Sequence, residues 1–505
     1  MLKRTGVRLQ LLTDIDQHLF VESGIRGGVA MVPNRHAVAN NPLVSDGYDA
    51  TKPNTYILYT DCNNLYGAAM SHPLPYDGFR WLDRNEIESL DVRNVSVDGD
   101  IGYILDVDLH YPDRLHDLHS DYPLAPVRQS VTSDMLSPYS KRLYETLTTK
   151  PGSSPPSSVE KLLTTLDDKQ NYVLHIRNLQ LYLSLGLELK AIHRVLCFKQ
   201  SAWLKPFIDF NTRKRREAAN SFEKDLFKLM NNAVYGKSLE NVRKRVDFRL
   251  VTTERRLHKL VSSPRLKRMI RYTDDVVGLS LRHKSIVLSR PIYVGFTVLD
   301  VSKTIMYDFH YRYAVAKYGS RVKLLMTDTD SLLYCIQTPD LYADIKADLH
   351  LFDTSDYPHD HPCHSDANKK VVGVFKDETC GRPIKEFVGL RAKCYSLLLA
   401  DDNSEKKVAK GVPRISIKRR LRHQMYIECL SDLCTYSTSS LGIRSERHQL
   451  FSMRNYKTSL SPYDDKRYLK DNGRDTLAYG HFSLGQCCDD DDDDDIAPAK
   501  RIRLE

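Results

Sequence analysis

The spacing of apolar and polar residues divides the first half of the chain into strands and helical blocks. Residues 56–60 (YILYT) and 101–109 (IGYILDVDL) are short runs rich in β-branched and aromatic residues, which is typical of strands. Residues 159–189 and 213–240 combine Leu and Ala at helical spacing with long charged side chains, so both blocks are predicted to be helical. Pro206 separates them.

The second half of the chain returns to strands. Residues 293–335 predict a strand over IYVGFTV, a helix through SKTIMYDFHYRYAVAKY and a second strand over VKLLMT. Residues 246–292 alternate in places and predict a small β-rich insertion, and residues 352–366 predict a loop. More strands are expected over 369–400 and a helix over 416–434. Strands flanking helical blocks predict an α+β (mixed α/β) fold with a mostly helical lobe inserted.

Composition narrows the class of protein. A length of 505 residues suits about three domains or one multi-lobed enzyme. The ten cysteines contain no CxxC pair, which favours a reducing compartment over a disulfide framework or a zinc ribbon. No apolar run approaches the ~18 residues of a membrane span, so no membrane partner is expected.

Charge points to a polyanionic partner. The formal net charge is +9, and residues 489–505 hold eight acidic and three basic residues. The rest of the chain holds 71 basic and 57 acidic residues, a net charge of +14. Nucleic acid is the commonest partner of so basic a protein, although a basic surface also serves solubility alone.

The strongest local signal for chemistry is LLMTDTDSLLY at residues 324–334. Asp328 and Asp330 lie between two apolar runs, which predicts the tip of a tight hairpin. Alternation by two places both carboxylates on one side, about 7 Å apart if extended. Two such acids suit a divalent cation with oxygen ligands. The alternative is an ordinary polar β-turn, because Asp is a favoured turn residue.

Two further segments are candidates for the same site as this hairpin. Asp61 stands where the strand YILYT stops, and it is either a helix N-cap or a third carboxylate. In FEKDLFKLMNNAVYGKSLEN, residues 222–241, helical geometry places Lys224, Lys228, Asn232 and Tyr235 within about 80° of arc. That face could hold a triphosphate and a base or sugar, or it could be a solvated charge stripe.

Taken in this order, the three segments resemble the motifs of family B DNA polymerases. DCNNLYG at 61–67 is similar to the first palm motif, KLMNNAVYG at 228–236 to the fingers motif, and TDTDS at 327–331 to the second palm motif. KCY at 393–395 is similar to the Lys-x-Tyr motif ahead of the thumb, and GIRGG at 24–28 takes the place of the Tyr-x-Gly-Gly linker of protein-primed enzymes.

The resemblance extends over about residues 5–484 and has a narrower component. The run from FDTSDYPHDHP to FVGLRAKCYS, together with the closing DDKRY and TLAYGH, is similar to polymerases of Polinton (Maverick) elements and related viral or organellar plasmids. The family implies a right-hand polymerase with a palm, helical fingers and a thumb, and the short segment before Asp61 leads us to expect no exonuclease domain. The implied parts are an N-terminal linker remnant (1–54), palm with an insertion (55–145), linker and helical fingers (146–245), a small inserted subdomain (246–292), second palm part (293–400), thumb (401–486) and a disordered acidic and basic tail (487–505).

The resemblance also assigns metal ligands. Asp61 and Asp330 would be the principal ligands of two Mg²⁺ ions, for which Mn²⁺ can substitute, and Asp328 would assist. The Cys62 carbonyl would touch the nucleotide-bound metal. These residues would make the chain a DNA-directed DNA polymerase that adds dNTPs to a primer 3′-hydroxyl, in replication of a mobile element or virus-like DNA.

Nucleotide and DNA contacts follow from the same resemblance. Lys228, Lys224 and either Arg213 or Arg216 would bind the incoming triphosphate, with Arg213 the better placed by helical angle. Tyr66 would exclude a 2′-hydroxyl, and Tyr235 and Asn232 would line the nascent base pair. The primer-template would be held by Lys393 and Tyr395, by Gly27 and Gly28 of the linker, and by the thumb residues Lys418, Arg419 and Arg420.

The chain departs from the family pattern without losing an expected metal ligand. Asn64 stands where Ser is common, Gly67 where Pro is common, and Ala233 where Ser is common. Met326 replaces the usual leading Tyr of the second palm motif, and Ile25 replaces the Tyr of the linker. The alternative function is a catalytically dead or truncated remnant that only binds nucleic acid.

The C-terminal tail suggests a location and a partner. Seven consecutive aspartates, 489–495, repel one another and expose the basic segment APAKRIRL at 497–504. That segment resembles a nuclear localisation signal, so the expected location is the nucleus, with an import receptor as a partner, or otherwise the cytoplasm. The aspartates could instead mimic DNA and cover the basic groove. A terminal protein that primes synthesis is a further partner implied by the family.

Overall fold

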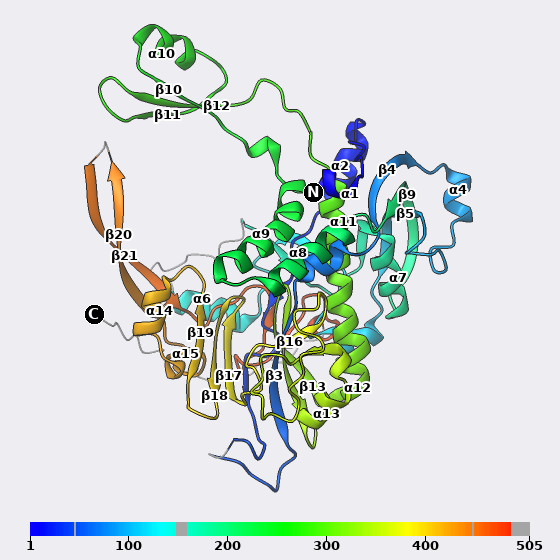
Figure 1. Ribbon diagram of the computed structural model, residues 1–505. Helices are drawn as coiled ribbons and strands as arrows, with labels where there is room; N and C mark the ends of the chain where they lie inside the picture. Colours follow the sequence, from blue (N-terminus) through cyan, green and yellow to red (C-terminus); the bar gives the residue numbers. More distant parts are fainter. Residues whose placement is uncertain (45–46, 148–158, 447–448, 486–505) are drawn as a thin grey trace.

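A six-stranded sheet stands at the centre of the computed structural model, which describes residues 1–44, 47–147, 159–446 and 449–485 (Figure 1). In order across the sheet its strands are β1 (Ala30–Met31), β13 (Val322–Asp328), β14 (Ser331–Gln337), β3 (Thr55–Cys62), β16 (Phe375–Asp377) and β15 (Phe352–Asp353). The strands predicted at 56–60 and 101–109, and the hairpin at 324–334, are confirmed.

Both faces of this sheet are covered, which explains why its strands are continuously apolar rather than alternating. Tyr56 and Leu58 of β3 belong to one core cluster, whereas Ile57 and Tyr59 belong to another on the opposite face. The second cluster joins β3 to a four-stranded sheet of β19 (Glu405–Ala409), β18 (Cys394–Leu399), β17 (Ile384–Arg391) and β2 (His36–Val38).

A long buried helix, α11 (Ile292–Tyr307), lies where the sequence predicts a strand over IYVGFTV, residues 292–298, so that prediction is wrong. It continues as a π-helical turn over Asp308–Val315, followed by α12 (Ala316–Tyr318). Every residue from Ile292 to Thr304 is buried. A helix surrounded by protein is apolar on all sides, and periodicity cannot distinguish such a helix from a buried strand.

A second sheet takes up part of the segment 159–189, for which helices are expected. Its order is β4 (Leu74–Trp81), β9 (Glu188–Ser201), β5 (Ile101–His110) and β8 (Lys169–His175). Only α7 (Ile176–Ser184) is helical in that block. The helical prediction is therefore wrong for β8 and for β7 (Glu160–Leu163), which pairs with β6 (Val127–Ser130), because pairing with partner strands outweighs local helix propensity.

A pair of helices covers the end of the central sheet where β3 stops (Figure 1). α8 (Lys205–Glu217) has Pro206 in its first turn, where proline is tolerated, and α9 (Ser221–Ser238) begins at the N-cap Asn220, whose side chain accepts from the Glu223 amide. A buried hydrogen bond of 2.8 Å, from Asn211 Nδ2 to Asn231 Oδ1, joins the two helices. This confirms the helices predicted over 213–240.

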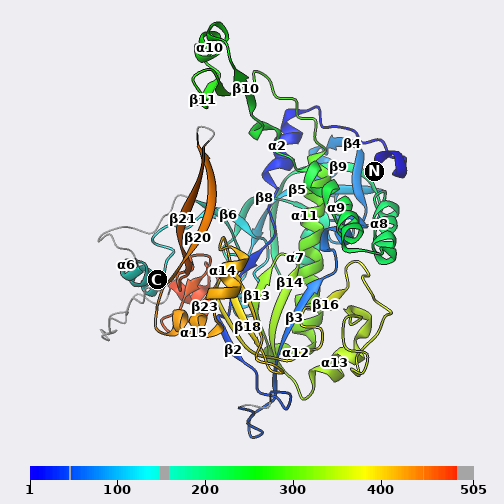
Figure 2. The same cartoon turned by 60° about the vertical axis from the view of Figure 1, so that its left-hand side comes forward.

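Two arms project from the body in both views (Figures 1 and 2). One is the predicted β-rich insertion: β10 (Asp247–Val251), α10 (Glu254–Val261), β11 (Leu266–Arg271) and β12 (Val277–Leu281). The other is the hairpin of β20 (Tyr436–Glu446) and β21 (Gln449–Leu460), which follows α14 (Arg414–Arg420) and α15 (His423–Ser431). The helix expected over 416–434 is thus present, with a break between the two helices.

The chain after β21 returns to the body through two fully buried arginines. Arg35 donates to the carbonyls of Leu390 and Gly473, each at 2.8 Å, and Arg467 donates to the Ser120 carbonyl at 2.7 Å. Buried guanidinium groups need such acceptors, so these contacts fix the C-terminal segment against the N-terminal residues.

The remaining short elements lie between these units. They are α1 (Leu2–Thr5), α2 (Ile15–Ser23), α3 (Leu65–Met70), α4 (Arg84–Ser89), α5 (His116–His119), α6 (Pro138–Leu147), α13 (Leu341–Ala347), β22 (Tyr468–Leu469) and β23 (Thr476–Leu477). Among the described residues, no helix combines the length and the apolar character needed to cross a membrane. The tail expected over 487–505 and most of the connector at 146–158 lie outside the described residues.

Candidate active site

Three carboxylates meet where the central strands end. Asp61 lies near the end of β3, and Asp328 and Asp330 flank Thr329 at the tip of the β13–β14 hairpin, where Thr329 has a φ of 68°. Asp61 pairs with Ser331 across the sheet, and the Cys62 amide donates to the Asp330 carbonyl at 2.7 Å. The structure therefore brings Asp61 together with two acids that lie more than 260 positions later in the sequence.

Burial and mutual repulsion disfavour the charged forms of these acids. The pKa of Asp61 is raised to about 7, first by burial and then by the nearby charges of Asp330 and Glu378, while Lys228 and Lys376 oppose the shift. The pKa of Asp330 is also raised, mainly by burial, and the charge of Asp328 adds to the shift. A cation bound between these acids would therefore stabilise their charged forms.

The donor set suits a hard divalent cation that shares its coordination with a substrate. Asp328 Oδ1 is buried and receives no hydrogen bond, although Lys393 Nζ lies 3.1 Å away as an ion-pair partner. In the part of the chain that the structure describes, no three His, Cys, Asp or Glu side chains form a ready-made metal cage. Mg²⁺ is commonly held by one or two carboxylates plus water and phosphate oxygens, so the acids fit this ion with a phosphate ligand present.

The raised pKa of Asp61 predicts a pH-dependent cost to the metal-free fold. The pKa of Asp61 is higher in the folded than in the unfolded chain. The contribution of this group to the free energy of unfolding is therefore fully present below about pH 4 and is lost as the pH rises to about 7. We expect Asp61→Asn to raise the Tm of metal-free protein by about 2 °C or more at pH 8 and to leave it unchanged near pH 4. Thermal unfolding in chelator-treated buffer measures this, and a Tm gain that is equal at both pH values would contradict it.

A cationic and amidic hollow lies beside the carboxylates. It is lined by Lys228 and Asn231 of α9, Thr212 and Arg215 of α8, and by Asn63, Asn64, Lys370 and Val372. Burial, Lys224 and Arg215 all lower the pKa of Lys370, which shows how closely these bases approach one another. So dense a set of positive charges suits a phosphate chain.

The arginine of α8 at this hollow is Arg215 and not the expected Arg213 or Arg216. Arg213 and Arg216 line a separate and larger cavity next to it. The sequence offers four consecutive basic residues, 213–216, and a helical angle chooses among them only when the roll of α8 about its axis is known. Packing on α9 sets that roll.

Two tyrosines, one from DCNNLYG and one from KLMNNAVYG, stack on each other near Asp330. The rings of Tyr66 on α3 and Tyr235 on α9 lie 4.3 Å apart and nearly parallel, at 17°. Burial raises the pKa of both hydroxyls, and Asp330 contributes to the shift at Tyr66. Asn232 also lies on α9, with a buried Oδ1 that receives no hydrogen bond.

Two departures from the family pattern compensate for each other. Asn64 adopts a left-handed conformation with φ 50° at the start of α3. A Cβ placed on Gly67 would lie 2.1 Å from Asn64 Nδ2, so no larger residue fits there while Asn64 keeps this position. Gly67 therefore accompanies Asn64 for a steric reason.

The other predicted DNA contacts lie on three separate parts of the fold. Lys393, at the β17–β18 turn with φ 61°, reaches Asp328, and the Tyr395 hydroxyl lies 2.9 Å from that of Tyr59. Lys418, Arg419 and Arg420 are exposed on α14, where Arg420 donates to Ser439 Oγ at the base of the hairpin arm. Gly27 and Gly28 lead into β1, which pairs with β13 at Asp328.

Glu378 is a carboxylate that sequence reasoning missed. It follows β16, which pairs with β3, and its amide donates to the Tyr59 carbonyl at 2.8 Å. Its charge raises the pKa of Asp61, and its own side chain pairs with Lys406 at 3.1 Å. Only the pairing of β16 beside β3 reveals it, because FKDET carries no recognisable pattern in sequence.

Comparison with known proteins identifies the fold. Neither a known family model nor a curated protein sequence matches the chain. Among solved structures, it is similar to phi29 DNA polymerase in complex with primer-template DNA and incoming nucleotide substrates, with TM-score 0.51 and 16% identity, and to the orthorhombic crystal form of phi29 DNA polymerase, with TM-score 0.52 and 15% identity. Each match covers 91% of this chain and 65% of the phi29 chain. The chain has a phi29 polymerase-like, mixed α/β fold.

Proposed function

We propose that the chain is a DNA-directed DNA polymerase of the protein-primed family B type. The observation that carries this proposal is the meeting of Asp61, Asp328 and Asp330 with Lys228 and the Tyr66–Tyr235 stack, in a chain with a phi29 polymerase-like fold. In this assignment the central sheet is the palm, α8 and α9 are the fingers, and α14, α15 and the β20–β21 hairpin are the thumb. The neighbour's complex with primer-template DNA and nucleotides supports the same substrates here.

The residues of the hollow would bind and orient the nucleotide. Lys228, Lys224 and Arg215 would hold the triphosphate through charge-assisted hydrogen bonds, with Lys370 closing the opposite wall. The Tyr66–Tyr235 stack would lie against the sugar and the nascent base pair, and Lys393 and Tyr395 would hold the primer end. A nucleotide held in this way places its α-phosphate toward the carboxylates and limits the geometries from which reaction can occur.

Asp61, Asp328 and Asp330, with the Cys62 carbonyl, would hold the divalent cations, Mg²⁺ or Mn²⁺. When bound, two such ions would activate the primer 3′-hydroxyl and neutralise charge on the departing pyrophosphate. The chain itself supplies a buried cluster of acids that repel one another, and this repulsion favours cation binding even without substrate. Lys393 forms an ion pair with Asp328 in the structure, and it would move to the primer phosphate when DNA binds.

Primer extension tests the proposal. Purified protein is incubated with a primed template, dNTPs and Mg²⁺ or Mn²⁺, and DNA binding is measured in parallel by gel shift. We expect templated extension; binding without extension would instead indicate the catalytically dead remnant. Extension that starts from a protein hydroxyl rather than a DNA primer would support the protein-primed assignment and replication of a mobile or virus-like element.

Sugar selection tests the role of Tyr66. Because its ring stacks on Tyr235 beside the carboxylates, Tyr66→Val opens space where a 2′-hydroxyl would lie. We expect the ratio of kcat/KM for dNTP over rNTP to fall by about tenfold or more, while Tyr48→Val, at an exposed site, leaves the ratio unchanged. An unchanged ratio in Tyr66→Val would show that the ring does not face the sugar.

The location of the protein remains a proposal from the sequence. A reporter too large to diffuse through nuclear pores, fused to residues 487–505, tests whether APAKRIRL directs import. Nuclear signal that is lost on changing Lys500 and Arg501 to Ala would support an import receptor as a partner. Cytoplasmic signal in both fusions would favour the role of the aspartates as a cover for the basic groove.

A further inference from the structure

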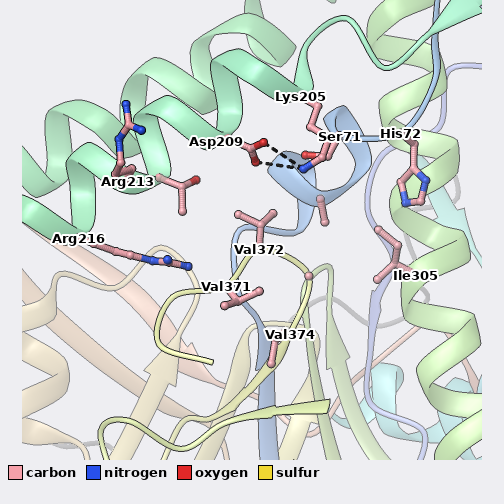
Figure 3. Close-up of a pocket in the computed structure, with 13 residues that line it drawn as sticks. Ser71, His72, Lys205, Asp209, Arg213, Arg216, Ile305, Val371, Val372 and Val374 are labelled. Carbon is pink, nitrogen blue, oxygen red and sulfur yellow. Dashed lines mark hydrogen bonds and ion pairs between the residues drawn. The ribbon is translucent and has the colours of Figure 1, made fainter. Parts of the chain in front are cut away.

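A cavity of about 610 Å³ lies between α8, the end of α3 and the loop of Val371–Val374 (Figure 3). Lys205, Asp209, Arg213 and Arg216 of α8 form one wall. Ser71 and His72, after α3, face them, and Figure 3 shows Arg216 extending from α8 toward the loop of Val371 and Val372. The cavity is distinct from the hollow that contains Lys228.

The two spaces adjoin, because they share two lining residues. Thr212 and Val372 line both the cavity and the hollow. Thr212 Oγ1 is buried and receives no hydrogen bond, at the point where the two spaces adjoin. Buried hydroxyls are rarely left without a partner, so this atom indicates that a polar group passes or rests there.

Charge and shape select a small anion as the occupant. Lys205 is neutralised by Asp209 at 3.0 Å, and burial lowers the pKa of His72, so Arg213 and Arg216 leave the wall with a net positive charge. The ion pair of Arg213 with Glu217 is long, at 4.0 Å, and Glu217 itself pairs with Lys214 at 2.8 Å. The Arg213 guanidinium also lies 5.8 Å from the centroid of the Phe210 ring. Guanidinium groups of this kind bind phosphate in a bidentate manner.

The lining argues against a strand of nucleic acid in this cavity. Apart from the charged residues and His72 it consists of small or aliphatic side chains, and it contains no Phe, Tyr or Trp. Sites for single-stranded nucleic acid depend on aromatic rings that stack the bases, in addition to basic residues. A ligand made only of phosphate has no need of such rings.

We propose that this cavity is the exit site of the pyrophosphate product, which leaves the triphosphate hollow past Thr212 and is received by Arg213 and Arg216. The inference rests on the proposed polymerase function. In that reaction the primer 3′-hydroxyl gives up its proton to water and its oxygen forms a bond to the α-phosphorus. The bond from the α-phosphorus to the bridging oxygen of the β-phosphate breaks, and that oxygen leaves with the pyrophosphate. The exit site separates the product from Lys228 and vacates the hollow for the next nucleotide.

Calorimetric titration of the full chain with inorganic pyrophosphate in Mg²⁺ buffer tests the site. We expect two equivalents to bind wild-type protein, one lost in Lys228→Gln and the other weakened about tenfold or more in the double variant Arg213→Gln/Arg216→Gln. Arg84→Gln/Arg114→Gln removes the same charge at exposed positions away from both spaces and should keep two equivalents with wild-type affinity.

Several results would overturn the exit site. One equivalent of pyrophosphate in wild-type protein would do so, as would two equivalents of wild-type affinity in the Arg213/Arg216 variant. If that variant keeps pyrophosphate binding but has a higher KM for dNTPs, the cavity is a nucleotide entrance; if it loses DNA affinity instead, the cavity contacts a strand. Wild-type primer extension with no second equivalent refutes the exit site alone, whereas two equivalents without any extension refute the polymerase and leave an anion site.

Discussion

Asp330→Asn lowers kcat for primer extension by about 10³-fold or more, because the two divalent cations that would bind the reacting phosphates then lose one of their carboxylate ligands. That factor corresponds to about 4 kcal/mol of transition-state stabilisation at 1.36 kcal/mol per decade. The fold should survive, since Asp330 and Asp61 are buried carboxylates that repel each other and the amide removes one of the two charges. Single-nucleotide extension under saturating dNTP measures the loss.

Asp360→Asn provides the matched control for this experiment. Asp360 is an exposed carboxylate in the loop before Cys363 and lines neither the hollow nor the cavity, so the same change of charge there should leave kcat at the wild-type value. Equal rates for wild type, Asp330→Asn and Asp360→Asn would refute the assignment of the acids. An Asp330→Asn protein that binds primer-template with wild-type affinity would place the loss in chemistry rather than in DNA binding.

The sequence predicts the carboxylate edge of the site well because the signals there are local. Asp328 and Asp330 sit between apolar runs that can only form a tight hairpin, and Asp61 ends a strand of β-branched and aromatic residues. What joins the two segments is the pairing of β14 with β3. The motif order implies that pairing through the family resemblance, whereas no local pattern does.

The other walls of the site depend on how elements pack. Lys370 lies in a loop and Glu378 follows a three-residue strand, so neither belongs to a periodic pattern. Arg215 is chosen over Arg213 and Arg216 by the roll of α8 on α9. The mistaken strand at 292–298 has the same origin, because α11 is apolar on every side and its neighbours, rather than its periodicity, make it a helix.

The second large effect on kcat is expected from a substitution in the linker segment GIRGG. The segment GIRGG passes behind the acid hairpin: the Thr329 amide donates to the Val29 carbonyl at 2.7 Å, and a Cβ on Gly28 would lie 2.4 Å from Thr329 Cγ2 and 2.9 Å from Thr329 Cβ. Rotation of the threonine can move its Cγ2 but not its Cβ, so a side chain at residue 28 must displace the turn between Asp328 and Asp330. Gly28 is thus a positioning residue for the two carboxylates.

We expect Gly28→Ala to lower kcat by about 10²-fold with little change in primer-template affinity, since a displacement of about 1 Å at reacting groups costs a factor of that size. Gly27→Ala is the matched control, because a Cβ at Gly27 has no atom within 4 Å. Rescue distinguishes positioning from general damage. Thr329 has a φ of 68°, a conformation that glycine adopts without strain, so Thr329→Gly removes the colliding side chain and suits the turn. The double variant Gly28→Ala/Thr329→Gly should recover most of the lost kcat, and a loss that is additive in the double variant would show that Gly28 acts elsewhere than on the acid hairpin.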